Sequence, residues 1–226
     1  MIQSHLKGTV CAKMKYSYVF WDWNGTIIDD AVASMDSVNL MLARRGRPPI
    51  NIDIYRDYVD IPIVKFYEKA FDMTREDMDS IAVEFNEGYK ACLSEEPLRD
   101  GAKEVLESLC SLGVKQCIFS SSANEIILSF LKMHGIAGYF EAVLGSGDYY
   151  VGSKLERTLG YIKEHGIDPK RTVFIGDMEH DREVASACGG DCVLLSGGHR
   201  PESELYATGE KVVGSLYEFA EYIKQQ

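Results

Sequence analysis

The amino-acid sequence predicts an α/β fold, namely a doubly wound parallel sheet with an inserted α-helical domain. Short, continuous apolar runs occur at 18–21, 117–119, 142–144, 172–175 and 192–195. Such runs are typical of parallel strands that are buried on both faces. Segments with helical periodicity separate the later runs, whereas roughly eighty residues without a clear strand pattern separate the first run from the second.

Helix signals follow the strand runs in chain order. Ser122 is predicted to cap the helix after the second run, which Gly135 ends, and Ser153 to cap the helix after the third run, which Gly166 ends. A further helix over 102–112 leads into the second run. This regular alternation of strand and helix favours the doubly wound sheet.

The insertion between the first two runs is predicted to be helical. Apolar periodicity predicts helices over 34–45, 63–71 and 74–93, and Thr74 with Asp77 can form a start similar to a capping box for the last of them. An insertion directly after the first strand lies over the carboxyl ends of the strands, where ligands bind in open α/β sheets. We therefore expect a helical cap over a ligand site.

These boundaries predict three parts of the chain. Residues 15–29 and 97–226 form the core with the sheet, residues 30–96 form the helical cap, and residues 1–14 form an N-terminal extension without a motif. The length of 226 residues and a hydrophobic share of 46% suit one domain with an insertion.

The composition excludes several classes of function. The 24 Lys+Arg against 35 Asp+Glu give a net charge of −11, which opposes binding to nucleic-acid phosphates. No apolar run approaches the roughly 20 residues of a membrane helix, and the N-terminus lacks the apolar core of a signal peptide. The six cysteines lack zinc-binding spacing. We expect a cytoplasmic protein that binds neither nucleic acid nor membrane, and its oligomeric state is left open.

Acidic side chains follow two of the predicted strands. Asp22 comes directly after the first apolar run, and Asp177 and Asp181 follow the fourth. Because the carboxyl ends of parallel strands meet at one edge of a sheet, we expect these carboxylates to converge. Converging carboxylates repel unless a hard cation joins them, and oxygen ligands of this kind suit Mg²⁺. The alternatives are a turn at Asp22 and helix capping by Asp177 and Asp181.

Two further strand ends carry groups that suit a phosphate. Ser120 and Ser121 follow the second apolar run, and Lys154 stands at a helix start after the third. Hydroxyl and backbone N–H groups bind an anion, and a lysine adds a positive charge. Thr26, in the turn after the first strand, is counted with these phosphate-binding residues. Taken singly, a lysine such as Lys154 is more often a solvated surface residue.

The order of these four motifs resembles that of the haloacid dehalogenase (HAD) superfamily of aspartate-nucleophile hydrolases. The similarity is to members with a helical cap after the first motif, such as phosphoglycolate phosphatases and β-phosphoglucomutases. It covers the chain from about Lys15 to its end, with 22–26 as the first motif, Ser120 as the second, Lys154 as the third and 176–181 as the fourth. The resemblance implies a Rossmann-like core and Mg²⁺-dependent hydrolysis of a small phosphorylated metabolite.

The resemblance also implies a role for each matched residue. Asp22 would attack phosphorus and become an aspartyl-phosphate, which water then hydrolyses. Mg²⁺ would be bound by the carboxylates of Asp22 and Asp177 and by the backbone carbonyl of Asn24, with Asp181 behind them. The serine and the lysine of the second and third motifs would hold the phosphoryl oxygens.

One matched position departs from the pattern of the family. Its phosphatases carry a second aspartate two residues after the nucleophile, which protonates the leaving oxygen and later activates water, and here that residue is Asn24. An amide performs neither task, and general acid–base catalysis contributes ~10²–10⁴-fold to a rate. The loss should be largest for alkoxide leaving groups and smaller for aryl or acyl phosphates.

Three functions stay open at this point. The first, which we favour because the other motifs are complete, is a slow or specialised phosphatase acting on phosphoglycolate, a sugar phosphate or a nucleotide. The second is an enzyme like the related phosphonate hydrolases, which also lack the second aspartate and form a Schiff base with a cap lysine; Trp23 and Lys65 are the candidates here. The third is a non-catalytic protein that binds a phosphoryl ligand on the same fold.

Overall fold

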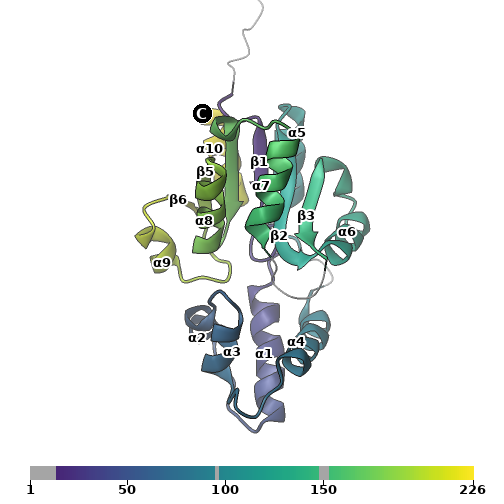
Figure 1. Cartoon of the computed structure of the whole chain (residues 1–226), viewed down its shortest axis with the longest axis vertical. Helices are drawn as coiled ribbons and strands as arrows, with labels where there is room; N and C mark the ends of the chain where they lie inside the picture. The colour runs from purple at the N-terminus through teal and green to yellow at the C-terminus, as the bar shows by residue number, and fades with distance from the viewer. Residues whose placement is uncertain (1–13, 95–96, 148–152) are drawn as a thin grey trace, which may run out of the picture.

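The computed structural model describes residues 14–94, 97–147 and 153–226. Within these ranges, six parallel strands form one sheet in the order β3-β2-β1-β4-β5-β6 (Figure 1). The strands are β1 (Tyr18–Trp21), β2 (Lys115–Ala123), β3 (Ala142–Ser146), β4 (Thr172–Gly176), β5 (Asp191–Leu195) and β6 (Lys211–Val213). Because the strand order reverses at β1, the predicted doubly wound sheet is confirmed.

Two features of the sheet differ from the prediction. Strand β6 was not expected, because it is only three residues long and begins with the exposed Lys211. Strand β2 continues beyond its apolar run as far as Ala123, which pairs with Ser146 after a shift in register. The prediction that Ser122 caps a helix is therefore wrong, since Ser122 lies on this strand and the next helix begins at Asn124.

Helices cover both faces of the sheet. They are α5 (Ala102–Ser111), α6 (Asn124–Met133), α7 (Lys154–Glu164), α8 (Glu179–Cys188), α9 (Glu202–Ala207) and α10 (Leu216–Gln225), with short 3₁₀ turns at Ala137–Tyr139 and Pro169–Arg171. Successive strand residues point to opposite faces. Val19 and Trp21 thus pack with α5, α6 and α10, whereas Phe20 packs with α7, α8 and α9. Burial on both faces leaves the carboxyl ends of the strands as the open edge.

A separate group of helices lies beyond this edge, below the sheet in Figure 1. It consists of α1 (Ala31–Arg44), α2 (Ile52–Tyr58), α3 (Val64–Ala70) and α4 (Met78–Cys92), and we call it the helical insertion. Its apolar cluster includes Val38, Met41 and Phe66. Helix α4 begins later than predicted, because Asp77 caps it by accepting the Ser80 N–H, whereas Thr74 bonds to Asp72 in the preceding turn.

The described ranges leave out most of the predicted N-terminal extension, of which they include only Met14. No helix within them is long and apolar enough to cross a membrane.

Candidate active site

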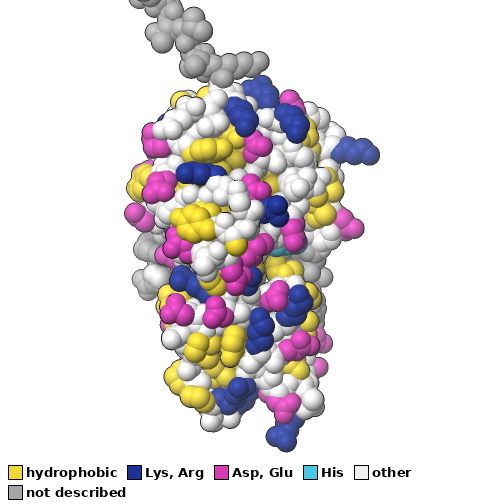
Figure 2. Space-filling view, turned by 90° about the vertical axis from the view of Figure 1, so that its left-hand side faces the viewer, with side chains coloured by type: hydrophobic (Ala, Val, Ile, Leu, Met, Phe, Trp, Pro, Cys, Tyr) yellow, Lys and Arg dark blue, Asp and Glu magenta, His cyan; other side chains and the backbone are white. Residues whose placement is uncertain are grey.

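A cavity of about 650 Å³ lies between the sheet and the helical insertion. The ends of β1, β2 and β4 form its floor, including Asp22, Ser120 and Asp177, and residues of α2, α3 and α4 line the opposite side. On one face of the molecule, acidic side chains gather at the level where the two parts meet (Figure 2). The cavity therefore lies at the edge of the sheet where the sequence predicts a ligand site.

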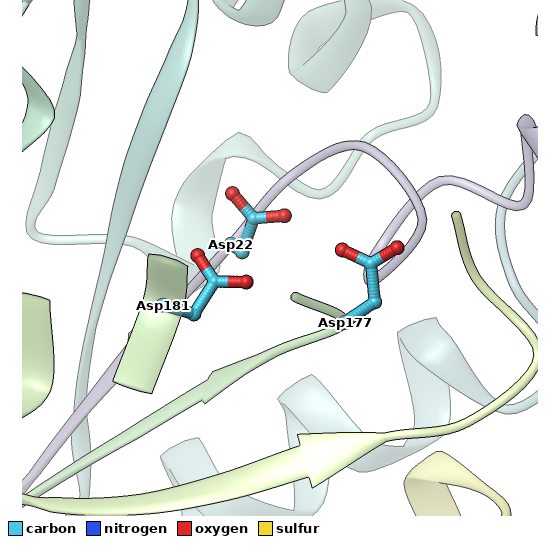
Figure 3. Close-up of side chains that lie close together, drawn as sticks. All are labelled: Asp22, Asp177 and Asp181. Atoms are coloured by element: carbon cyan, nitrogen blue, oxygen red, sulfur yellow. The ribbon is translucent and has the colours of Figure 1, made fainter. Parts of the chain in front are cut away.

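Three buried carboxylates converge on the floor of the cavity. Asp22 directly follows β1, Asp177 follows β4, and Asp181 lies in the first turn of α8. One oxygen atom from each carboxylate lies within 4.8 Å of the others, and Figure 3 shows all three side chains turned toward a common space. None of the three residues is more than 8% exposed.

Lys154 bridges two of these carboxylates. It is the first residue of α7, which Ser153 caps as predicted. Its Nζ lies 2.5 Å from Asp22 Oδ1 and 2.6 Å from Asp181 Oδ1. One ammonium group against three carboxylates leaves buried negative charge in excess, and hard oxygen donors of this kind fit a divalent cation such as Mg²⁺.

The protonation of this cluster is shifted by its burial. Burial raises the pKa of Asp22 to about 8, although the Lys154 ammonium opposes the shift. Burial likewise raises the pKa of Asp177 to about 6, with His199 opposing the shift and Asp181 adding to it. A cation bound here displaces protons from the carboxylates, so its binding should strengthen as the pH rises.

Glycines allow the loops to close around Asp177. Gly25 adopts a φ of 69°, and a Cβ atom built on it would overlap the Asp177 carboxylate. A Cβ atom on Gly198, in the loop after β5, would overlap the same carboxylate. The chain can therefore turn beneath Asp22 and approach Asp177 closely only because these positions lack a side chain.

The residues predicted to bind the phosphate lie at different depths. Ser120 and Ser121 line the cavity, and the Ser120 Oγ accepts the Ser122 N–H at 3.0 Å. Thr26 is fully buried and does not line the cavity, and its Oγ1 lies 3.5 Å from Asp22 Oδ2. Thr26 thus supports Asp22 from behind, and its place among the phosphate-binding residues stays a prediction.

The Asn24 side chain is held at both ends. Its Oδ1 accepts a hydrogen bond from Ser122 Oγ at 2.5 Å, and its Nδ2 donates to Asp30 Oδ2 at 2.6 Å. Tyr89, on α4, donates to the same Asp30 oxygen at 2.8 Å. The position that departs from the family pattern is therefore tied to the helical insertion as well as to strand β2.

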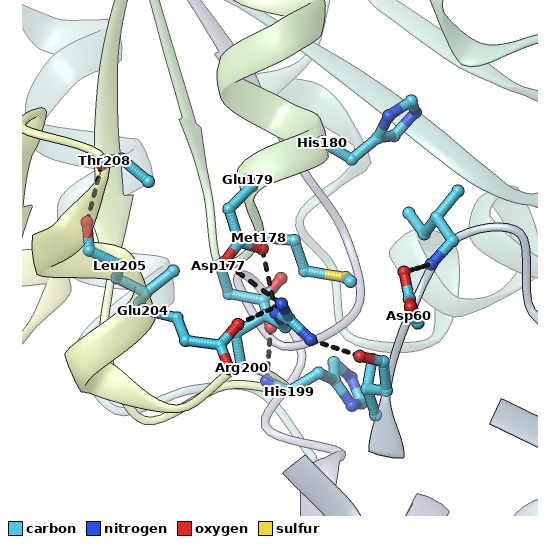
Figure 4. A network of polar contacts seen from close by, with 12 residues as sticks. Asp60, Asp177, Met178, Glu179, His180, His199, Arg200, Glu204, Leu205 and Thr208 are labelled. Atoms are coloured by element: carbon cyan, nitrogen blue, oxygen red, sulfur yellow. Dashed lines mark hydrogen bonds and ion pairs between the residues drawn. The ribbon is translucent and has the colours of Figure 1, made fainter. Parts of the chain in front are cut away.

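His199 completes this network, although no sequence pattern gave it a role. Its backbone N–H donates to Asp177 Oδ2 at 2.5 Å, and its Nε2 lies 3.1 Å from Asp30 Oδ1. Its Nδ1 lies 2.9 Å from the hydroxyl of Tyr55 on α2. Burial opposes the charge of the imidazole, but Tyr55 and Asp30 raise the pKa of His199 well above its usual value. Figure 4 shows His199 beside Asp177.

Arginines also tie the helical insertion to the loop after β5. Arg56 Nε, on α2, donates to the carbonyl of Gly198 at 2.9 Å. In the opposite direction, Arg200 donates to the carbonyl of Val59 and pairs with Glu179 at 2.9 Å (Figure 4). These contacts hold the helical insertion against the loop that carries His199, directly beside the acidic cluster.

The lysine considered for a Schiff base lies elsewhere. Lys65 is exposed, its Nζ is 3.4 Å from Asp60 Oδ1, and it does not line the cavity. Trp23, the other residue of that alternative, does line the cavity and packs edge to face against Phe130.

Fold and site together define an α/β enzyme whose centre is a cluster of buried carboxylates at the ends of parallel strands. The model of the family described as haloacid dehalogenase-like hydrolase matches residues 19–195. The chain belongs to this family of hydrolases, so the predicted family is confirmed.

Curated relatives and solved structures agree with this assignment. The chain is 26% identical over 198 residues to a phosphoglycolate phosphatase from Pseudomonas fluorescens, covering 82% of this chain and 72% of the relative. It is 26% identical over 192 residues to a phosphoglycolate phosphatase from Caulobacter vibrioides, covering 81% of each. A haloacid dehalogenase-like family hydrolase from Streptococcus pneumoniae superimposes with a TM-score of 0.75 at 19% identity, over 92% of this chain and 98% of that one.

A structure described as a predicted phosphoglycolate phosphatase from Haemophilus somnus gives a TM-score of 0.77 at 17% identity, over 93% of this chain and 99% of that one. At such identities, the two solved structures show the shared fold.

Proposed function

We propose that this protein hydrolyses phosphate monoesters through a covalent aspartyl-phosphate on Asp22, with Mg²⁺ as its cofactor. The proposal is carried by one observation: Lys154 Nζ lies 2.5 Å from Asp22 Oδ1, beside three carboxylates whose oxygens lie within 4.8 Å of one another. A nucleophile, a cation and a site for a metal ion thus share one cavity. The names of the phosphoglycolate phosphatase relatives support a phosphate ester as the substrate.

The residues of the cavity floor have different roles in the proposed reaction. Asp22 is the nucleophile, and Ser120, Ser121 and Lys154 hold the phosphoryl oxygens as charge develops on them. A phosphoryl group beside Asp22 would share the Lys154 ammonium, which now pairs with the carboxylates of Asp22 and Asp181. Binding and activation of the ester therefore use the same lysine.

The donor set suits Mg²⁺. The carboxylates of Asp22 and Asp177 and the backbone carbonyl of Asn24 are the hard oxygen ligands that this ion prefers, and Asp181 balances the charge of Lys154 behind them. When bound, Mg²⁺ would offset the negative charge of the cluster, so that an anionic ester can approach an anionic nucleophile.

Asn24 makes the proposed enzyme a specialised one. Its amide is engaged by Ser122 and Asp30 and has no proton to give to a leaving oxygen. We therefore expect small phosphorylated metabolites with good leaving groups to react fastest. The phosphonate hydrolase alternative loses its predicted lysine, because Lys65 does not line the cavity, whereas Lys90 of α4 does.

The test is a panel of phosphate esters, assayed for phosphate release with Mg²⁺ and with EDTA. We expect release with Mg²⁺ alone, and at least about a hundredfold less from Asp22→Asn, which keeps the size of the side chain but removes the nucleophile. Beryllium fluoride with Mg²⁺, a mimic of the aspartyl-phosphate, should raise the melting temperature of the native protein and not that of Asp22→Asn.

The other outcomes of this test separate the alternatives. Stabilisation by beryllium fluoride without hydrolysis of any ester would indicate a non-catalytic phosphoryl-binding protein. If beryllium fluoride did not stabilise the protein and no ester released phosphate, the proposed function would be refuted.

A further inference from the structure

Above its charged floor, the cavity is lined by apolar side chains. Trp23 and Phe130, from the sheet side, lie edge to face with ring centroids 5.6 Å apart. Phe85 and Tyr89, from α4 on the opposite side, stack with centroids 6.0 Å apart. Such walls favour a ligand group that buries apolar area and contacts aromatic rings.

The mouth of the cavity is apolar as well. Ile126 and Met133, on α6, line the cavity and are 39% and 74% exposed. Ile63, from the helical insertion, lines it from the other side and is 37% exposed. Apolar side chains exposed at the edge of a binding cavity are characteristic of ligand-binding surfaces. An apolar group that extends from the floor toward the mouth would cover them.

Most charged side chains of the lining are paired. Among the described residues of the lining, no arginine occurs, and Lys154, His199 and His180 each pair with a carboxylate. Lys90, an exposed residue of α4, is the remaining positive group of the lining, and acidic side chains also line the walls. The charged groups therefore do not select the leaving group, and the apolar walls carry that argument.

Asn24 also restricts which leaving groups can react. Without an acid at position 24, the leaving oxygen must depart as an anion. A phenol, with a pKa of about 10, forms this anion far more readily than an aliphatic alcohol, which resembles water with a pKa of about 16. Asn24 and the aromatic walls of the cavity thus point independently to an aromatic leaving group.

We propose that the substrate is an aryl phosphate monoester whose leaving group is apolar. This proposal rests on the proposed function. An oxygen of Asp22 bonds to phosphorus while the bond from phosphorus to the aryl oxygen breaks, and the electron pair departs with the phenolate, which takes a proton from solvent. Water then bonds to phosphorus, the bond to Asp22 breaks, and the products are a phenol and inorganic phosphate.

The experiment compares kcat/KM for four esters in the presence of Mg²⁺: 2-naphthyl phosphate, phenyl phosphate, 2-phenylethyl phosphate and phosphoglycolate. Naphthol and phenol have similar acidity, so their ratio reports apolar contact, and we expect at least about tenfold in favour of the naphthyl ester. Phenyl and 2-phenylethyl phosphate differ chiefly in the leaving oxygen, and we expect about a hundredfold in favour of the phenyl ester. Phosphoglycolate should be the poorest of the four.

A pair of variants on one helix tests the apolar contact itself. Ile126→Ala shortens a side chain of the lining, whereas Leu128→Ala makes the same kind of change at an exposed residue of α6 outside the lining. Ile126→Ala should lower kcat/KM for the naphthyl ester about fivefold and leave the phenyl ester less affected. Leu128→Ala should change neither, and because both residues are exposed, neither change should disturb folding.

The outcomes distinguish this proposal from the proposed function. Hydrolysis of phosphoglycolate at least as fast as of 2-naphthyl phosphate would overturn the aryl substrate and leave the phosphatase in place. The aryl substrate would also be overturned if kcat/KM were equal for 2-naphthyl and phenyl phosphate and if Ile126→Ala and Leu128→Ala had the same effect on it. If none of the four esters, nor any ester of the wider panel, released phosphate with Mg²⁺, both proposals would fall together.

Discussion

The Asn24 amide and the Asp30 carboxylate are joined by a hydrogen bond of 2.6 Å from Nδ2 to Oδ2. The same carboxylate accepts the Tyr89 hydroxyl at 2.8 Å and the Gly25 N–H at 2.7 Å, and it faces the imidazole of His199. Asn24, Tyr89 and Gly25 therefore all donate to this carboxylate. An aspartate at position 24 would place one acceptor against another, so the amide is matched to the carboxylate beside it.

Asn24→Asp should therefore destabilise the protein. We expect a loss of about 1–3 kcal/mol in the free energy of unfolding at pH 8, because a half-buried carboxylate at position 24 would face the buried carboxylate of Asp30 without a donor between them. The loss should shrink at pH 5, where one of the pair can hold a proton and donate it. Urea unfolding at both pH values measures the difference.

A matched control for this change is Asn51→Asp. Asn51 caps α2 by accepting the Ile54 N–H at 2.9 Å, and an aspartate can accept the same bond. Its unfolding free energy should stay within about 0.5 kcal/mol of the native value. Equal losses for both variants would contradict the match between Asn24 and Asp30.

Asn24 should also cause the phosphorylated enzyme to accumulate. The group that would activate water for the second step is absent, so hydrolysis of the aspartyl-phosphate should be slow, by as much as ~10²–10⁴-fold. With a good leaving group, phosphorylation of Asp22 is fast by comparison. Rapid-quench measurement should then show a burst of about one equivalent of phenol, followed by a slower steady rate.

Mass spectrometry of the quenched protein should locate one phosphoryl group on Asp22 during this burst. Asp22→Asn should show neither the burst nor the added mass. Linear phenol release from the first time point, with no phosphorylated protein, would place the slow step before phosphoryl transfer and contradict the expectation.

The parts of this site that could be predicted from sequence depend on local signals. Asp22, Asp177 and Lys154 each follow a strand that its own residues identify, and parallel strands bring their ends to one edge of the sheet. His199 carries the same signal, because it lies shortly after β5 in a glycine-containing loop. His199 therefore occupies the same kind of position, after a strand end, as the residues that were predicted.

The remaining partners depend on tertiary contacts that have no local signature. Tyr89 lies in the middle of α4, and its hydroxyl reaches Asp30 only because the helical insertion packs over the sheet. Ser122 has the appearance of a helix cap, but pairing between β2 and β3 extends the strand through it, and its hydroxyl is then free to bond to Asn24. Non-local pairing thus overrides the local capping preference.

Without a metal ion, stability should fall as the pH rises. In the folded protein the pKa values of Asp177 and Asp22 are raised to about 6 and about 8, whereas unfolded aspartates titrate near 4. Between these values the folded state holds protons that the unfolded state has released, so this stabilisation is fully present below pH 4 and is lost through pH 6 and 8. The slope is up to about 1.4 kcal/mol per pH unit for each proton.

Thermal melts in EDTA should therefore show a lower melting temperature at pH 8 than at pH 5, and Mg²⁺ should remove most of that fall by replacing the protons. Asp22→Asn, which lacks one of the two titrating groups, should show a shallower fall in EDTA. The same pH dependence with and without Mg²⁺ would show that the ion does not bind at these carboxylates.

The last prediction compares two lysines through the same substitution. Lys154→Met should cost about 3–5 kcal/mol of unfolding free energy in EDTA at pH 8, because it leaves buried carboxylates without their cation. Added Mg²⁺ should restore part of this loss while hydrolysis stays abolished, since the phosphoryl oxygens lose their positive contact. Lys65→Met removes an exposed pair 3.4 Å from Asp60 and should change stability by no more than about 0.5 kcal/mol. If Lys65→Met instead abolished turnover and Lys154→Met preserved it, chemistry at the cap lysine would replace the mechanism on Asp22.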